Sequence, residues 1–115
     1  MWWTVSGIVG ALGVALGAFG AHGLKNVVED PAMLVTWETA ARYHLFHALA
    51  LGLVAVHPTT PKWAGALFVA GILLFSGSLY TMVLTGQRWL GAITPIGGVC
   101  LIAGWLVLAF ASRGT

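Results

Sequence analysis

The sequence predicts an all-α integral membrane protein folded as one four-helix bundle. Of its 115 residues, 59% are hydrophobic and only 7% are charged, and the apolar residues fall into four long runs separated by short polar breaks. Soluble domains carry about 25% charged residues, so this chain cannot cover its surface with polar groups and must face lipid. Strand-like alternation is absent from the sequence. Helices pair every backbone amide within one segment, so we expect helical spans rather than a barrel.

Each apolar run is long enough to cross a membrane. About 20 residues at a rise of 1.5 Å span a hydrocarbon layer of ~30 Å. The predicted spans are residues 2–23, 37–57, 63–85 and 89–111. They occupy most of residues 1–115, so we expect a single transmembrane domain whose function lies inside the bundle or at its rims.

The first span carries glycines at steps of three or four, which place them on one helix face. These residues are Gly7, Gly10, Gly13, Gly17, Gly20 and Gly23. In lipid, small residues let two helix backbones approach closely, and Gly13 and Gly17 have the small-xxx-small spacing. We expect this face to be a packing seam, with a glycine-lined conduit as the alternative.

The second span begins with the strongest polar pattern in the chain. Glu38 and Arg42 are four residues apart with the acid first, so they can pair on one helix face. A second row at the same spacing lies beside this pair: Thr39, Tyr43 and His47. His44 is expected to point elsewhere. Because a charge inside a membrane is costly without a partner or a function, this helix face is a candidate site.

Polar side chains of the other spans are expected in the same half of the bundle. Neighbouring spans run in opposite directions, so the ends of the first and third spans meet the starts of the second and fourth. The candidate ligand-binding residues gathered there are His22, Glu38, Arg42, Tyr43, His47, Ser78, Tyr80 and Thr94. The other half of the bundle is much more apolar.

The fourth span contains a built-in break. Pro95 has no amide hydrogen and clashes with the carbonyl of Gly91, while Gly97 and Gly98 loosen the next turn. We therefore expect helix four to be kinked near Pro95. Broken helices build ion sites in some transporters, but Pro and Gly are also ordinary packing residues of membrane helices.

The sequence predicts no metal, no cofactor, no enzyme and no nucleic-acid site. His44-x-x-His47 offers two metal ligands, whereas zinc takes three or four from the protein; a haem between His22 and either of them is a weaker alternative. No G-x-S-x-G motif occurs, and no second carboxylate accompanies Glu38 within the spans. The net charge of +2 comes without a basic cluster, which argues against nucleic acid.

Charges and tryptophans near the span ends bear on orientation. Lys62 and Arg113 lie on the side of the termini, and Lys25 and Arg88 lie on the other. The count is nearly balanced, and we expect both termini in the cytoplasm. Tryptophans are expected to mark the span ends, as aromatic belts do: Trp2, Trp3, Trp37, Trp63 and Trp89.

Four motifs, in order along the chain, closely resemble the family called domain of unknown function 423, whose animal relatives are of the transmembrane protein 256 type. They are GAFGAHGL at 17–24, Trp37 with YxxxHALA at 43–50, FSGSLY at 75–80, and TPIGG at 94–98 with GW at 104–105. The resemblance implies a small four-helix protein of the bacterial inner membrane with no established activity. His22, Tyr43 and His47 match motif positions. His44 departs from them, since the family more often has glutamine there, which weighs against a two-histidine metal site.

Two classes of function fit these features. The chain is expected to be an intramembrane binding, scaffold or assembly-accessory protein; the alternative is a small transporter or channel for a polar solute, ion or lipid. The expected partners are the lipid bilayer and either a second copy or another membrane protein, contacted through the glycine face of the first span or the apolar Trp-bearing faces. A water-accessible cavity reaching His47 from the first loop would favour transport, whereas a dry, fully paired interior would favour binding.

Overall fold

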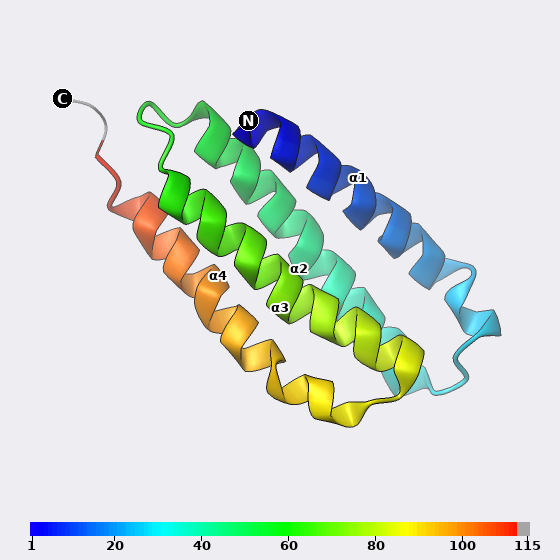
Figure 1. The fold of residues 1–115 in the computed structure, drawn as a ribbon. Helices are drawn as coiled ribbons and strands as arrows, with labels where there is room; N and C mark the ends of the chain where they lie inside the picture. Colours follow the sequence, from blue (N-terminus) through cyan, green and yellow to red (C-terminus); the bar gives the residue numbers. More distant parts are fainter. Residues whose placement is uncertain (113–115) are drawn as a thin grey trace.

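The computed structural model describes residues 1–112, which form four long helices and no strand (Figure 1). The long helices are α1 (Trp2–Ala21), α2 (Pro31–Val56), α3 (Lys62–Thr85) and α4 (Thr94–Ala109), with two short 3-10 helices, η1 (Leu24–Asn26) and η2 (Arg88–Ala92). Four segments are long and apolar enough to span a membrane, the fourth being Arg88–Ala109. The prediction of an all-α, four-span protein is confirmed. Arg113, used above to weigh orientation, lies outside the described residues.

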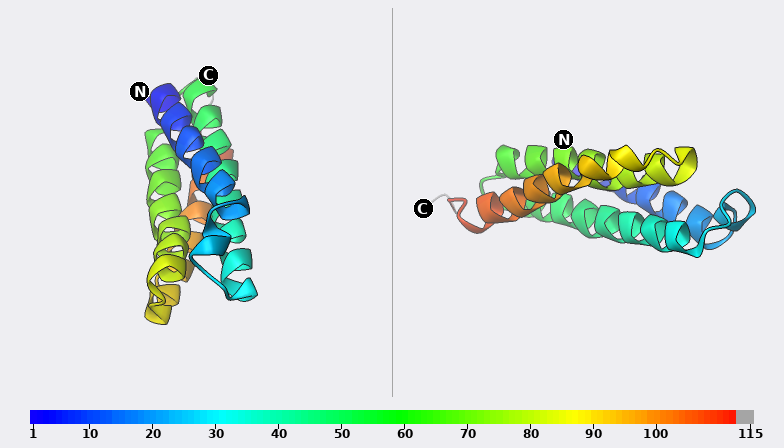
Figure 2. Two further views of the ribbon diagram at one scale, coloured as in Figure 1. Left: turned by 90° about the vertical axis from the view of Figure 1, so that its right-hand side faces the viewer. Right: turned by 90° about the horizontal axis from the view of Figure 1, so that it is seen from below.

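The four helices form a flattened bundle rather than a closed one. The molecule measures 54 × 25 × 17 Å. The main contacts between helices join α1 to α2, α2 to α3, and α3 to α4, so α2 and α3 lie between the outer helices in the view of Figure 1, and Figure 2 gives two further views of the bundle. In the 18-residue cores of the spans, 44% of α2 and 39% of α3 residues are buried, against 6% and 17% in the first and fourth spans. The outer helices α1 and α4 therefore leave most of their surface to lipid.

Helix α2 begins at Pro31, whereas the predicted span begins at residue 37. The carboxylate of Asp30 accepts a hydrogen bond of 2.9 Å from the amide of Ala32, and Pro31 occupies the first turn, where its missing N–H costs nothing. With 26 residues, α2 is about 39 Å long, which exceeds the ~30 Å hydrocarbon layer. Glu38 therefore lies about two turns inside the helix, roughly 9 Å from its midpoint.

The glycine face of α1 packs directly on α2, so the predicted seam is confirmed. A Cβ added at Gly13 would lie 2.7 Å from Leu45, and one added at Gly20 would overlap the indole of Trp37. Where α2 covers this face, around Gly13, the face is not free to contact a second copy.

The predicted break in the fourth span is also confirmed, and the span bends by 31°. It takes the form of η2 followed by a fresh helix start, with Pro95 in the first turn of α4. A proline there removes no helical hydrogen bond. Directly after it, Gly97 packs against the backbone of α3 at Phe75, which holds the two helices in close contact.

Two apolar core clusters stack along the bundle, one toward each membrane face. The cluster near the first loop contains Leu24, Trp37, Ala40, Leu79 and Val83, and the other contains Leu51, Val54, Phe68, Ile72 and Leu101. The buried polar residues His44, His47 and Ser76 lie between them in sequence along α2 and α3. The middle of the bundle is thus more polar than either cluster.

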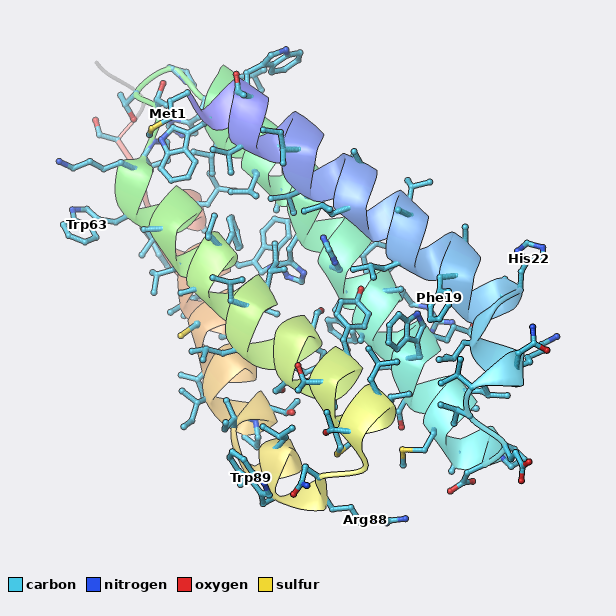
Figure 3. The ribbon with its side chains drawn as sticks, turned by 45° about the vertical axis from the view of Figure 1, so that its right-hand side comes forward. Met1, Phe19, His22, Trp63, Arg88 and Trp89 are labelled. Carbon is cyan, nitrogen blue, oxygen red and sulfur yellow. The ribbon has the colours of Figure 1, made fainter. Side chains whose placement is uncertain are left out.

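The tryptophans divide into two groups. Trp63 and Trp89 project outward at opposite ends of the molecule, as expected for a belt (Figure 3). The expectation for Trp37 is wrong, because this side chain is only 2% exposed. Its indole N–H donates a 2.7 Å hydrogen bond to the carbonyl of Leu16, which ties α2 to α1.

Candidate functional site

The predicted site residues do not converge on one cavity. His22 and the Glu38–Arg42 pair lie on the outside of the bundle, and Tyr43 is also exposed, at the edge of a groove. The residues that lie among the helices are His47, Ser78, Tyr80 and Thr94. That any of them binds a ligand stays a prediction, and their geometry decides what they can do.

The charge pair of α2 forms as predicted but faces outward. Arg42 Nη2 lies 2.9 Å from Glu38 Oε1, and the two side chains are 55% and 69% exposed. No other charged side chain is paired with them among the described residues. The two opposite charges compensate each other on this outer side of α2, which lowers the cost of placing a charge inside a membrane span.

His22 lies at the end of α1, directed away from the other helices (Figure 3). Its Nδ1 donates to the carbonyl of Ala18 at 3.0 Å, which helps to end the helix. It does not face His44 or His47. Within residues 1–112 no three His, Cys, Asp or Glu side chains are grouped so that they could hold a metal ion.

His44, predicted to point away from the row of Thr39, Tyr43 and His47, is a central residue of the interior. Its Nε2 lies 2.8 Å from the carbonyl of Val9 in α1, and its Nδ1 lies 3.0 Å from the hydroxyl of Tyr80 in α3. Because a carbonyl can only accept, Nε2 carries the hydrogen and Tyr80 donates to Nδ1. Gly13 in the facing seam leaves space for this ring, because a Cβ placed at Gly13 would lie 3.2 Å from Cδ2 of His44.

His47 also uses both ring nitrogens, and one of its hydrogen bonds joins α2 to α4. Its Nδ1 donates to the carbonyl of Tyr43 at 2.7 Å, and its Nε2 accepts a 3.0 Å hydrogen bond from the indole of Trp105. The carbonyl and the indole N–H fix a single neutral form of the ring. Both histidines therefore use both ring nitrogens within the protein, which leaves no nitrogen free for a metal.

Hydroxyl groups complete a set of cross-helix ties. Ser76 donates to the carbonyl of Ala40 at 2.7 Å, and Ser78 and Thr94 share a 2.7 Å hydrogen bond between α3 and the start of α4. On the other side, Ser6 donates to the carbonyl of Ala48 at 2.8 Å. In residues 1–112, every buried side-chain nitrogen or oxygen has a partner. Each such bond within a membrane is worth ~0.6 kcal/mol, so together they hold the helices in one arrangement.

Two grooves interrupt this packing. The α1–α2 groove, of about 490 Å³, lies near the first loop and is lined by residues that include Gly17, Gly20, Lys25, Val35, Trp37 and Glu38. The α2–α4 groove, of about 360 Å³, is lined by residues that include Tyr43, His47, Phe75, Gly98, Ile102 and Trp105. The two share no lining residue, and no loop residue lines the second. His47 is therefore reached from the lipid side of the α2–α4 groove and not from the first loop.

Comparisons with known proteins agree with this architecture. A family model described as "Protein of unknown function (DUF423)" matches residues 16–98. A UPF0382 membrane protein of Schizosaccharomyces pombe is 42% identical, covering 92% of this chain and 96% of its own length. A UPF0382 membrane protein of Staphylococcus aureus is 49% identical, covering 91% of this chain and 92% of its own length. The UPF0382 membrane protein YwdK of Bacillus subtilis is 46% identical, covering 88% of this chain and 86% of its own length. No solved structure matches the chain.

The relatives' names describe membrane proteins and indicate no enzymatic activity. Together with the four apolar helices, these names indicate a multi-pass membrane protein, of the inner (plasma) membrane type in bacteria. The resemblance seen in the four sequence motifs is confirmed by the family match over residues 16–98. This chain belongs to the DUF423 family of membrane proteins of unknown function.

Proposed function

We propose that this protein is a rigid intramembrane binding or scaffold protein, neither a conduit nor an enzyme. The observation that carries the proposal is the set of paired polar side chains in the interior. A transported solute needs protein groups that can bind it, and here His44, His47 and Ser76 already bond to other helices. Admitting a solute would require breaking these ties in a medium where unpaired polar groups are costly.

The thickness of the molecule supports the same proposal. Packed helices lie 8–10 Å apart, so a shortest dimension of 17 Å accommodates two helix layers in direct contact. A water-filled passage between the layers would need more space. Transport by this chain would therefore need a pathway formed between several copies.

Accessibility of engineered cysteines tests the proposal. In a Cys100→Ala background, which removes the one native cysteine, Ser76→Cys and Ser78→Cys place thiols in the interior at nearly constant volume. A charged, membrane-impermeant maleimide is applied to both faces of opened vesicles. Asn26→Cys, in the exposed first loop, serves as the water-accessible control, and Leu73→Cys, on the lipid-facing side of α3, serves as the lipid control.

We expect the two serine positions to react no faster than Leu73→Cys. Reaction at a rate within about tenfold of Asn26→Cys, in protein that still elutes as a folded species, would contradict the proposal and favour the transporter or channel alternative. The expected partners remain the bilayer and either a second copy or another membrane protein.

A further inference from the structure

The α2–α4 groove lies at the middle of the membrane. Tyr43 is about 18 Å along a helix that is about 39 Å long, and Phe75 lies near the centre of α3. Gly98 and Trp105 occupy the body of α4. Phospholipid head groups lie outside the ~30 Å hydrocarbon layer, so they do not reach this depth. Any occupant of the groove must therefore dissolve in hydrocarbon.

The walls of the groove are flat rings. Tyr43 packs on Phe75 with ring centroids 4.7 Å apart, and it lies nearly parallel to His47, at an interplanar angle of 7°. Trp105 closes the far side, with its ring centroid 5.9 Å from that of His47. Ring faces and edges of this kind pack well against another flat ring.

Gly98 keeps the groove open. A Cβ added at Gly98 would meet only Phe75, at an ordinary 3.8 Å, whereas one added at the neighbouring Gly97 would run into the backbone of α3. Packing between helices thus requires glycine at 97 but not at 98. The missing side chain at 98 leaves space on the groove side of α4.

The hydroxyl of Tyr43 is a polar group of the groove without a hydrogen-bond partner in the described residues. Tyr43 is 42% exposed at mid-membrane, and in residues 1–112 its hydroxyl makes no hydrogen bond, in contrast to Tyr80, His44 and His47. A hydroxyl facing hydrocarbon without a partner is unfavourable. A ligand with a carbonyl oxygen would accept its hydrogen.

We infer that the α2–α4 groove binds a neutral, lipid-soluble molecule with a flat ring that carries a carbonyl oxygen, of the quinone class. No Asp, Glu, Lys or Arg is among the described residues that line the groove, so the ligand is uncharged. The volume of about 360 Å³ falls in the range of small-molecule sites, roughly 300–1,000 Å³. A lipid tail would also fit an apolar groove, but it would leave the Tyr43 hydroxyl unpaired. This inference rests on the proposed binding function and names its ligand class.

The test measures binding of decyl-benzoquinone to the whole protein in phosphatidylcholine nanodiscs, followed by quenching of tryptophan fluorescence. Tyr43→Phe removes only the hydroxyl, and Gly98→Leu fills the groove. Gly7→Leu is the matched control, because a Cβ at Gly7 meets nothing within 4 Å. Hexadecane, which has neither ring nor carbonyl, serves as competitor.

We expect saturable quenching that is lost in Gly98→Leu, unchanged in Gly7→Leu and resistant to hexadecane. Loss of one hydrogen bond should weaken the Kd about tenfold in Tyr43→Phe. Quenching that does not saturate in the wild-type protein would overturn the inference. The inference would also be overturned if Tyr43→Phe left the Kd unchanged and hexadecane displaced the quinone, because these two results together identify a groove for lipid tails. If the cysteines at positions 76 and 78 do not react with the maleimide and no quinone binds, only the ligand class is rejected. If those cysteines do react, the proposed function itself is rejected.

Discussion

The contact between α3 and α4 at Gly97 gives the sharpest prediction about stability. An alanine Cβ at this position would lie 2.6 Å from the carbonyl carbon of Leu74 and 2.8 Å from Cα of Phe75, and closer still to the Phe75 amide nitrogen. These are backbone atoms, which cannot swing aside as a side-chain end can. Gly97→Ala therefore has to push α4 away from α3.

The magnitude follows from what that displacement costs. Overpacking of a well-packed core typically costs about 1–3 kcal/mol, and the upper part of this range applies because the obstacle is backbone. The new alanine recovers up to ~1 kcal/mol of helix propensity relative to glycine. We therefore expect Gly97→Ala to lower the free energy of unfolding by about 1–2 kcal/mol.

Gly98→Ala is the matched control, since the substitution is the same and lies one residue away. Its Cβ makes only a 3.8 Å contact with Phe75, so helix propensity should leave it neutral or up to ~1 kcal/mol more stable. Reversible unfolding in mixed micelles, titrated with sodium dodecyl sulfate and followed by far-UV circular dichroism, measures both. Equal stability of the two variants would refute the close helix contact at Gly97.

Two further predictions concern polar side chains, measured by the same titration. Glu38→Gln should lower the unfolding free energy by about 2–3 kcal/mol, because it leaves Arg42 without its counter-charge on the outer side of a membrane span; a change below about 0.5 kcal/mol would mean that water or head groups reach the pair. Tyr80→Phe should cost about 0.6–1.7 kcal/mol, because it leaves Nδ1 of the buried His44 without its donor. Tyr43→Phe removes a hydroxyl that has no partner in residues 1–112, so it should lower the unfolding free energy less than either of the other two variants. A loss as large as that of Tyr80→Phe would show that the Tyr43 hydroxyl is hydrogen-bonded.

The spans and the helix-one seam were predictable because lipid imposes simple requirements. Length and hydropathy fix the number of helices, and glycine spacing marks where two of them meet. The start of α2 could also have been found: Asp30-Pro31 is a helix-start signal, but it lies before the apolar run on which the prediction was based.

The roles of the individual polar side chains were harder to predict. His44 and His47 are three residues apart on one helix, yet they bond to α1 and α3 in one case and to α4 in the other. Their partners include the backbone carbonyls of Val9 and Tyr43, and such groups leave no mark in a sequence. Trp37 was misplaced for the same reason, since its partner is the carbonyl of Leu16.

The ties between α1 and α2 also bear on the order in which the chain assembles. Trp37 bonds to Leu16, His44 to Val9, and Ser6 to Ala48, so the first two helices are joined near one end, at the middle and toward the other end. None of these bonds needs a residue beyond position 48. The first two spans can therefore pair as a hairpin during membrane insertion, before the third has been synthesised, and Tyr80 then supplies the second partner of His44 when α3 arrives.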